Sequence, residues 1–278
     1  MIDTFTSIHA TMFLKSVRVL VTRPKNQAKS LAKAIESRLG NVWVLPMLVI
    51  APLSESQQMR NLLLNLDQFD KIIVTSQNAA RYGLALVDQY WPQLPVGIDW
   101  YAIGSQTATT MSHYSITGKT PAVGLDSEAL LDLADLGDVK KQKVLIIKGK
   151  GGRTLISDTL KARGAIVEQL LTYERQLPDY NTTNPLPSML RENRINTILC
   201  TSAETVTNLL HFLPKSQIPH LFLILPSQRV ASTFSALPFR QIIVSEGASN
   251  EALLASLDIL QEQLARLDQI NKHSEELS

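Results

Sequence analysis

Apolar and polar residues alternate along this chain with two different periods. Residues 17–22 form a compact run rich in valine, and Pro24 follows at a position where a helix can begin. Apolar side chains then recur at helical spacing, at Leu31, Ala34, Ile35 and Leu39. This pattern predicts a strand, a loop and a helix, in that order.

The same order of elements is predicted further along the chain. Residues 67–74 and 194–201 each lead a predicted strand into a Thr-Ser pair, and a helical pattern follows both. Strands that alternate with helices are typical of a parallel sheet covered by helices. The sequence therefore predicts an α/β fold.

Four stretches of the first half recur in the second half, in the same order and at nearly the same spacing. The pairs are 18–23 with 143–148, 73–76 with 199–202, 105–107 with 227–229, and 128–131 with 251–254. A unit of this length is too long for a solenoid repeat. We therefore predict two pseudo-repeated α/β domains, each with a parallel sheet, and a ligand cleft between them.

Two long extended segments occupy matching positions in the two copies. Residues 42–50 contain Pro46, which disfavours a central sheet strand, and residues 166–175 form the second segment. We interpret both as crossing points, which makes the first domain discontinuous. The predicted parts are domain 1 at 17–45 plus 176–260, domain 2 at 50–167, linker strands at 46–49 and 168–175, and extensions at 1–16 and 261–278.

Composition narrows the class of protein. The chain has 278 residues, 45% hydrophobic and 19% charged, with a net charge of +2, which describes an ordinary globular protein without a general polyanion-binding surface. We expect no nucleic-acid partner. The first sixteen residues do not resemble a secretory signal, and no run approaches the roughly 20 apolar residues of a membrane span. We expect no membrane association.

The single cysteine, Cys200, lies in the apolar run 198–200. One cysteine cannot form an intramolecular disulfide, and this fits a reducing, cytoplasmic setting. A lone thiol within a strand is usually a small buried hydrophobe. We therefore assign Cys200 to the core and not to a nucleophile.

Polar residues follow the predicted strands at equivalent places. Ser76 and Ser202 each end a strand and precede a helix, Asn78 falls in a first helical turn, and Thr107 and Arg229 begin another helix. Ligands of open parallel sheets bind outside the carboxyl ends of the strands, where helix N-H groups point outward. Plain helix capping, worth about 1 kcal/mol for each residue, is the alternative explanation.

The loop at 148–154 combines three glycines with three cations and suits an anion. It lacks the glycine spacing of a P-loop or a dinucleotide fingerprint, so we do not expect nucleotide binding. The five histidines are scattered without ligand spacing, and we expect no metal site.

No Gly-x-Ser-x-Gly elbow is present, which argues against hydrolase chemistry. Tyr173 lies in the second crossing segment, where its phenol would reach the cleft as a weak acid or hydrogen-bond donor. Packing of the linker is the alternative role for this side chain.

Taken together, these segments resemble uroporphyrinogen-III synthase of the bacterial type. The likeness covers about residues 17–258. The matching segments are 21–24, 73–79, 102–108, 124–131, 148–153, 173–175, 201–202 and 249–254. The sequence departs from the family pattern at Arg229 and at 225–226, where Leu-Pro stands in place of Ile-Gly.

The resemblance implies two α/β domains joined by a two-stranded ladder. It implies an enzyme, a cyclising lyase, that takes linear hydroxymethylbilane, eliminates its hydroxyl as water and inverts the last pyrrole through a spiro intermediate, giving uroporphyrinogen III for heme biosynthesis. No cofactor is used. We further expect a monomer that receives its substrate from the upstream hydroxymethylbilane synthase.

Site residues are carried over position by position. Tyr173 matches the family tyrosine thought to assist departure of the hydroxyl, which makes it the candidate general acid. The residues expected to bind the substrate carboxylates are Arg23, Ser76, Asn78, Thr107, Lys148, Arg153, Ser202 and Arg229. Arg23 and Arg153 have an alternative role, since each would pair equally well with an acidic residue at the surface.

Two other classes of function stay open on sequence grounds. A two-domain binding protein that closes on a small polyanionic ligand without chemistry would share the hinge and the cleft. A regulatory or interaction module derived from the enzyme would keep the fold and lose the activity.

Overall fold

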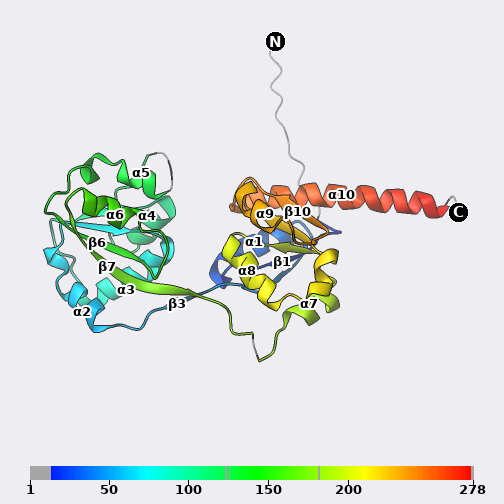
Figure 1. Ribbon diagram of the computed structural model, residues 1–278, viewed down its shortest axis with the longest axis horizontal. Helices are drawn as coiled ribbons and strands as arrows, with labels where there is room; N and C mark the ends of the chain where they lie inside the picture. The colour runs from blue at the N-terminus through cyan, green and yellow to red at the C-terminus, as the bar shows by residue number, and fades with distance from the viewer. Residues whose placement is uncertain (1–13, 123, 125, 181, 277–278) are drawn as a thin grey trace, which may run out of the picture. The chain divides into compact units, whose positions relative to one another are not determined.

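The computed structural model describes residues 14–122, 124, 126–180 and 182–276. The chain divides into two compact units. Unit 1 comprises the described residues up to Val49 and those from Leu177 onward, and unit 2 comprises Ile50–Gln176. In the colour scheme of Figure 1, unit 1 therefore joins the blue start of the chain to its yellow, orange and red end.

Unit 1 is built on a sheet of five strands. Its order is β10 (Gln241–Val244), β9 (Phe222–Leu225), β8 (Thr197–Leu199), β1 (Arg18–Val21) and β2 (Asn41–Val44), and all neighbouring pairs are parallel. β1 lies between β2 and β8, so the start of the chain sits inside a sheet whose other members, apart from β2, come from the end of the chain. β2 stops at Val44, two residues before Pro46, and is an edge strand, as expected for a segment that runs into proline.

Helices cover both faces of this sheet. The buried residues of α1 (Lys25–Glu36) are Ala28, Leu31, Ala32 and Ile35, a spacing that gives an amphipathic helix. They pack with leucines of α10 (Asn250–Glu276) against one face. The other face packs against the remaining unit 1 helices: α7 (Leu186–Glu192), α8 (Ala203–Phe212), η3 (Lys215–His220) and α9 (Gln228–Phe234).

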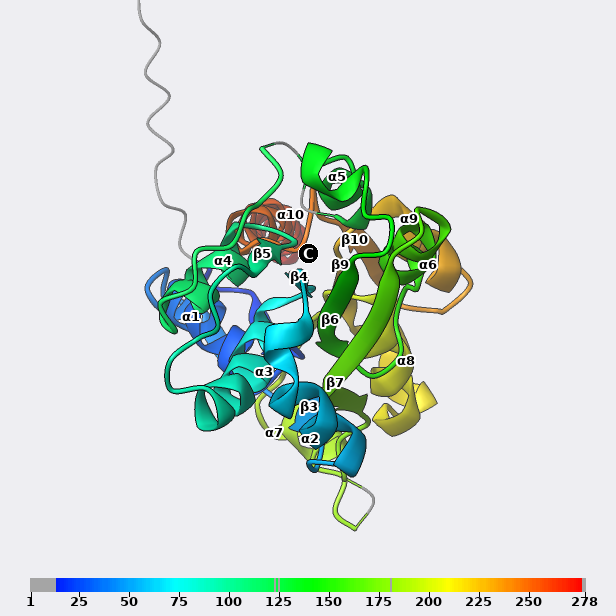
Figure 2. The same ribbon diagram turned by 90° about the vertical axis from the view of Figure 1, so that its left-hand side faces the viewer.

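Unit 2 repeats this plan. Its sheet has the order β3 (Val49–Pro52), β7 (Ile166–Gln176), β6 (Lys143–Gly149), β4 (Lys71–Val74) and β5 (Asp99–Ala102). The pairs from β7 to β5 are parallel, and Figure 2 shows β6 and β7 side by side. All four residues of β4 are buried, because this strand lies inside the sheet with helices on both faces.

The helices of unit 2 fall into two groups. One face of the sheet packs against α2 (Gln57–Leu64), η1 (Leu66–Gln68), α3 (Gln77–Tyr90) and α4 (Ser105–Ser112). The opposite face packs against α5 (Ser127–Leu131), η2 (Ala134–Leu136) and α6 (Leu155–Ala162).

The two sheets share one strand order, which confirms the predicted pseudo-repeat and the α/β class. The series β9-β8-β1-β2 in unit 1 corresponds to β5-β4-β6-β7 in unit 2. The repeated sequence stretches fall on β1 and β6, at the ends of β8 and β4, at the starts of α9 and α4, and on α10 and α5.

Several predicted boundaries differ from the structure. Residues 168–175, expected as a linker strand, belong to β7, which pairs with β6 from Ile166 to Tyr173 and so is part of the sheet of unit 2. The predicted extensions are also too long. The first thirteen residues lie outside the described part, but Leu14 is fully buried in unit 1, and the Ser16 amide donates to Gln261 in α10. α10 continues the core through Leu260 and runs on to Glu276.

Candidate active site

In unit 2 the carboxyl end of β4 leads directly into α3. Ser76 has an extended backbone and caps this helix, because its Oγ accepts a hydrogen bond from the Ala79 amide over 3.0 Å. Thr75 is fixed to the neighbouring strand, since its amide donates to the Ile147 carbonyl over 3.1 Å. The predicted Thr-Ser motif therefore stands at the carboxyl edge of the sheet.

The carboxyl end of β6 leads into the glycine-rich loop. Gly151 and Gly152 both have left-handed backbones, with φ of 75° and 78°, a conformation that favours glycine. Nζ of Lys148 donates to the Arg153 carbonyl over 3.3 Å, which closes the loop on itself. The loop thus carries cations on a backbone whose shape depends on two consecutive glycines.

Tyr173 comes from β7, the strand beside β6. The register between these strands shifts at Gly149: Lys148 pairs with Leu171, but Gly149 pairs with Tyr173. Because of this irregularity, the Tyr173 ring packs directly against Gly149. The side chain is only 5% exposed, and its Oη lies 3.1 Å from Oγ of Ser76. Two of the predicted site residues are therefore in direct contact.

These segments surround a pocket of about 370 Å³ in unit 2. Its lining includes Thr75, Ser76, Ser127, Ser157, Gln169 and Tyr173, the residues from Lys148 to Arg153, and Arg175. Four lining side chains are cationic, those of Lys148, Lys150, Arg153 and Arg175, and within the described chain none of the lining side chains is acidic. The pocket is suited to a ligand with several negative charges.

Two of these cations already have carboxylate partners just outside the pocket. Lys150 Nζ lies 3.1 Å from Glu174, and Arg153 forms a bidentate pair with Glu128 from α5. The guanidinium of Arg153 lowers the pKa of Glu128 through these hydrogen bonds. Hydrogen bonds from Gln176 and then Lys150 lower the pKa of Glu174. Arg153 thus binds the carboxylate of Glu128 in the same bidentate way that it is expected to bind a carboxylate of the substrate.

Two predicted residues of unit 2 lie apart from the pocket wall. Asn78 is half-buried in the first turn of α3, and Thr107 in α4 is 4% exposed. Neither belongs to the described lining. Their sequence positions beside strand ends were predicted correctly, but the direction of each side chain depends on helix packing.

In unit 1 the predicted residues follow β1, β8 and β9, which are neighbours in the sheet. Ser202 caps α8 in a capping box, since its Oγ accepts from the Thr205 amide over 3.1 Å and its own amide donates to Thr205 Oγ1. Arg229 is exposed in the first turn of α9. Both follow the carboxyl ends of strands in the sheet of unit 1, as Ser76 and Thr107 do in the sheet of unit 2.

Arg23 follows β1 but has a partner within the protein. It is 8% exposed, its Nη1 donates to Asn250 Oδ1 over 2.8 Å, and its Nη2 donates to the Ala248 carbonyl. Burial lowers its pKa from the ordinary arginine value. The alternative considered for Arg23 was a surface pair with an acidic residue, and the structure shows a different arrangement, in which the buried guanidinium donates to an asparagine and a backbone carbonyl. Its guanidinium ties the β1 loop to the start of α10.

Cys200 is fully buried next to Thr22. Burial raises the pKa of its thiol to about 12, so the reactive thiolate is suppressed at neutral pH. The assignment of Cys200 to the core is confirmed.

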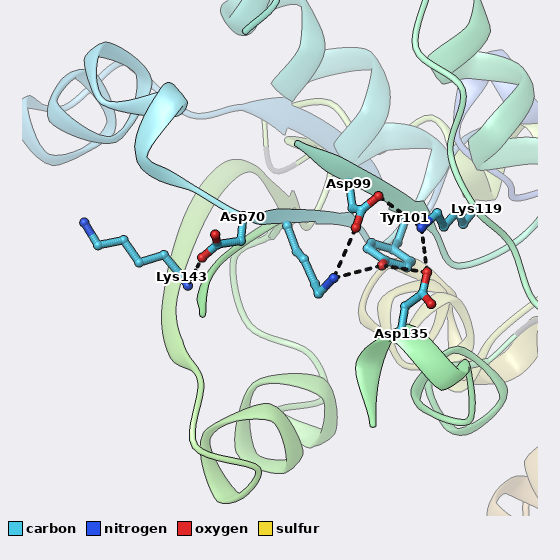
Figure 3. A network of polar contacts seen from close by, with 7 residues as sticks. Asp70, Asp99, Tyr101, Lys119, Asp135 and Lys143 are labelled. Atoms are coloured by element: carbon cyan, nitrogen blue, oxygen red, sulfur yellow. Dashed lines mark hydrogen bonds and ion pairs between the residues drawn. The ribbon is translucent and has the colours of Figure 1, made fainter. Parts of the chain in front are cut away.

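A second polar cluster, which the sequence did not indicate, lies at the amino ends of β4 and β5, away from the pocket (Figure 3). We call it the polar ring. Its members are Lys71, Asp99, Lys119, Asp135 and Tyr101. Lys71 is 6% exposed and bonds to Asp99 at 3.2 Å and to Tyr101 at 3.3 Å, while Lys119 bridges Asp99 at 3.0 Å and Asp135 at 2.5 Å. The Tyr101 hydroxyl donates to Asp135 over 3.4 Å and closes the ring.

The described residues contain no group of three or more His, Cys, Asp or Glu side chains arranged to hold a metal ion. None of the helices in the described ranges is both long and apolar enough to cross a membrane.

Comparison with known proteins points to one family. A family model described as uroporphyrinogen-III synthase HemD matches residues 29–255. Uroporphyrinogen-III synthase of Escherichia coli K12 is 30% identical over 250 residues, which cover 86% of this chain and 99% of that protein. The Salmonella typhimurium LT2 enzyme of the same name is 30% identical over 248 residues, with the same coverage of both chains.

Solved structures show the same fold at lower identity. A mutant uroporphyrinogen III synthase from the extremely thermophilic bacterium Thermus thermophilus aligns with a TM-score of 0.57 and 16% identity, covering 90% of this chain and 100% of that one. The uroporphyrinogen-III synthetase of Helicobacter pylori 26695 aligns with a TM-score of 0.56 and 14% identity, covering 89% and 99%.

Proposed function

The chain belongs to the uroporphyrinogen-III synthase family, and we propose from this premise that it closes linear hydroxymethylbilane into uroporphyrinogen III. The reaction eliminates the terminal hydroxyl as water and inverts ring D. The family consists of cyclising lyases of heme biosynthesis. For this chain, the cationic pocket beside the buried phenol of Tyr173 is the observation that supports the proposal best.

Tyr173 is the proposed proton donor. The phenol gives its proton to the substrate hydroxyl, the carbon–oxygen bond breaks, and the hydroxyl departs as water. Closure of the ring releases a proton, which restores the phenol. The position of Tyr173 supports this role, since its ring is fixed within the core of unit 2 while the residue lines the pocket.

The cations of the pocket are the proposed carboxylate ligands. Hydroxymethylbilane carries eight carboxylates, and Lys148 and Arg153 line a pocket wall without acidic side chains among the described residues. Charge-assisted hydrogen bonds of this kind orient a substrate as well as bind it. Orientation matters because the enzyme must direct attack to the substituted carbon of ring D.

Other groups complete the proposed set of contacts. Ser202 and Arg229 supply a hydroxyl and a cation at the carboxyl edge of the unit 1 sheet, and the first turns that hold Asn78 and Thr107 supply backbone amides. We leave Arg23 out of the set because its guanidinium is buried and hydrogen-bonded within the protein. We also propose that the protein acts as a cytoplasmic monomer and receives its substrate from hydroxymethylbilane synthase.

The decisive test is the isomer of the product. Purified protein is supplied with hydroxymethylbilane made in place by the upstream synthase, the products are oxidised, and the uroporphyrin isomers are separated. Unassisted closure gives isomer I. A dominant isomer III is the expected result, whereas isomer I alone from folded protein would contradict the proposal and favour a binding or regulatory protein for a polyanionic ligand.

A further inference from the structure

We propose that Ser76 and Gly149 are positioning residues that act through Tyr173: Gly149 provides the space for the ring, and Ser76 directs the phenolic proton toward the pocket. This inference rests on the proposed role of Tyr173 as proton donor. From its sequence position, Ser76 was expected to bind a substrate carboxylate. This inference gives it a different role.

The case for Gly149 is steric. A Cβ atom at this position would lie 2.5 Å from Cζ of Tyr173 and 2.7 and 2.9 Å from two further ring carbons. Real Cβ atoms do not approach other heavy atoms this closely, so the ring would have to move. The backbone of Gly149 is not left-handed, in contrast to Gly151 and Gly152. Glycine is therefore required here by the ring of Tyr173 and not by the local conformation.

Other contacts limit where the ring can go. The Lys150 amide donates to the Tyr173 carbonyl over 2.7 Å, which fixes the strand beside the register shift. The ring of Tyr82 in α3 lies 6.2 Å from that of Tyr173, centroid to centroid. Because backbone and neighbours are both fixed, a methyl group at Gly149 would displace the phenol from its place beside Ser76.

The role of Ser76 follows from the number of hydrogen bonds that its hydroxyl can donate and accept. A serine hydroxyl has one proton to donate and two lone pairs. Oγ of Ser76 already accepts the Ala79 amide proton, and its other contact is Oη of Tyr173 at 3.1 Å. If Ser76 donates to Oη, the proton of the phenol stays free to point at a ligand in the pocket.

This arrangement gives a directed series of donors. The amide at the start of α3 donates to Ser76, Ser76 donates to Tyr173, and Tyr173 donates to the departing hydroxyl of the substrate. The Ser76 hydrogen bond then persists after proton transfer and stabilises the phenolate, since hydrogen bonds to an ionised acceptor are stronger than neutral ones. A serine engaged in this way has no second proton with which to bind a substrate carboxylate.

A double-mutant cycle tests this role. Ser76→Ala and Tyr173→Phe should each lower kcat at least about tenfold, with KM changed less than about twofold, because the lost interaction operates in the transition state. In the Tyr173→Phe background, Ser76→Ala should have no further effect on kcat. An equal loss in both backgrounds, or a raised KM with unchanged kcat, would show that Ser76 acts independently of Tyr173.

Two variants separate positioning from helix capping. Ser76→Thr keeps a hydroxyl and should restore most of the turnover lost in Ser76→Ala. Ser56 caps α2 in the same way, accepting from the Met59 amide over 3.2 Å, and does not line the pocket among its described residues. Ser56→Ala should lower the thermal stability like Ser76→Ala and leave turnover unchanged. Loss of turnover in Ser56→Ala would assign the effect to capping and overturn the proposal.

Gly149→Ala should reduce kcat to about the level of Tyr173→Phe. Gly118→Ala is the matched control, since its Cβ would approach the flexible end of Met111 at 2.8 Å and Ala102 Cβ at 3.4 Å without meeting Tyr173, and its turnover should stay unchanged. If Gly149→Ala does not fold, Gly149→Ala combined with Tyr173→Ala should fold, because the clashing ring is gone. Wild-type turnover in Gly149→Ala would overturn the steric part of the inference.

The outcomes also distinguish this inference from the proposed function. Isomer III from the wild-type protein together with full turnover in Tyr173→Phe would reject the inference and leave the synthase function in place. Isomer I alone from the wild-type protein would reject the function itself.

Discussion

Nη1 of Arg23 lies 2.8 Å from Oδ1 of Asn250, so the second residue after β1 is hydrogen-bonded to the first residue of α10. A second bond runs to the Ala248 carbonyl, and Arg23 is 8% exposed. Arginine keeps its charge even where burial lowers its pKa. This contact joins the two ends of the chain within unit 1.

We predict that Arg23→Ala destabilises unit 1 by about 2 kcal/mol, because it removes a buried guanidinium and both of its hydrogen bonds, and bonds from a charged donor are stronger than neutral ones. Urea unfolding followed by circular dichroism measures the loss. Arg229→Ala is the control, since Arg229 is exposed in the same unit, and its unfolding should match that of the wild type. Unchanged stability in Arg23→Ala, with a raised KM, would return Arg23 to the substrate-binding set.

The polar ring predicts an acid-sensitive unit 2. Hydrogen bonds from Lys119 are the main cause of the lowered pKa values of both Asp99 and Asp135. A carboxylate whose folded pKa is lowered contributes stability above its unfolded pKa of about 3.9, and this contribution disappears as the pH falls through the folded value. Stability should therefore be retained above about pH 4 and fall below it.

Lys119→Met should shift the midpoint of acid unfolding to higher pH. Without the bridging ammonium the pKa values of the two carboxyl groups rise, and the carboxylates repel one another. Circular dichroism between about pH 2 and pH 6 measures the midpoint. Lys140→Met removes an exposed lysine of the same unit and serves as the control. Equal midpoints for both variants would show that the ring does not stabilise the unit.

Cys200 should be inert in the folded protein. Its thiol is fully buried, and burial raises its pKa to about 12, so alkylating reagents meet neither an accessible sulfur nor a thiolate. We expect iodoacetamide at pH 8 to leave turnover unchanged, and to label the protein only after unfolding. Cys200→Ala should retain full turnover. Rapid inactivation of the native protein would contradict the assignment to the core.

The fold was predictable because its signals are local and repeated. Apolar runs marked β1, β4, β6 and β8, and the repeat showed that these strands have equivalent places in two sheets. Pro46 was expected to disfavour a central strand, and it lies between β2 and β3, each of which is an edge strand of its sheet. Residues 168–175 were predicted as a linker strand and lie within β7, and an extended segment has the same pattern whether it crosses between units or pairs along its length, as β7 does.

The site was predictable at its strand ends and less so in its side-chain contacts. Ser76, Lys148, Arg153 and Tyr173 meet in one pocket of unit 2. The contact of Tyr173 with Gly149 depends on a register shift, and no local pattern indicates it. The partners of Arg23 lie far away in sequence. That Ser202 and Arg229 bind the same substrate molecule stays a prediction.

The ion pair of Glu128 with Arg153 occupies a side chain that is proposed to bind a substrate carboxylate. Both side chains are exposed, so the pair is weak enough for a substrate carboxylate to displace it. Glu128→Gln should therefore lower KM for hydroxymethylbilane about two- to fivefold, and Arg153→Ala should raise it by a similar factor, with kcat unchanged in both.

The repeat offers a matched control for this competition. Glu251 holds the equivalent position at the start of α10 in unit 1, and Glu251→Gln should leave KM at the wild-type value. In the combined variant Glu128→Gln and Arg153→Ala, KM should equal that of Arg153→Ala alone, because Glu128 competes only for Arg153. Steady-state rates at low ionic strength measure these differences most sharply, since salt screens exposed charges. A KM that responds to Glu128→Gln equally with and without Arg153 would mean that Glu128 repels the substrate directly, and the displacement model would then be wrong.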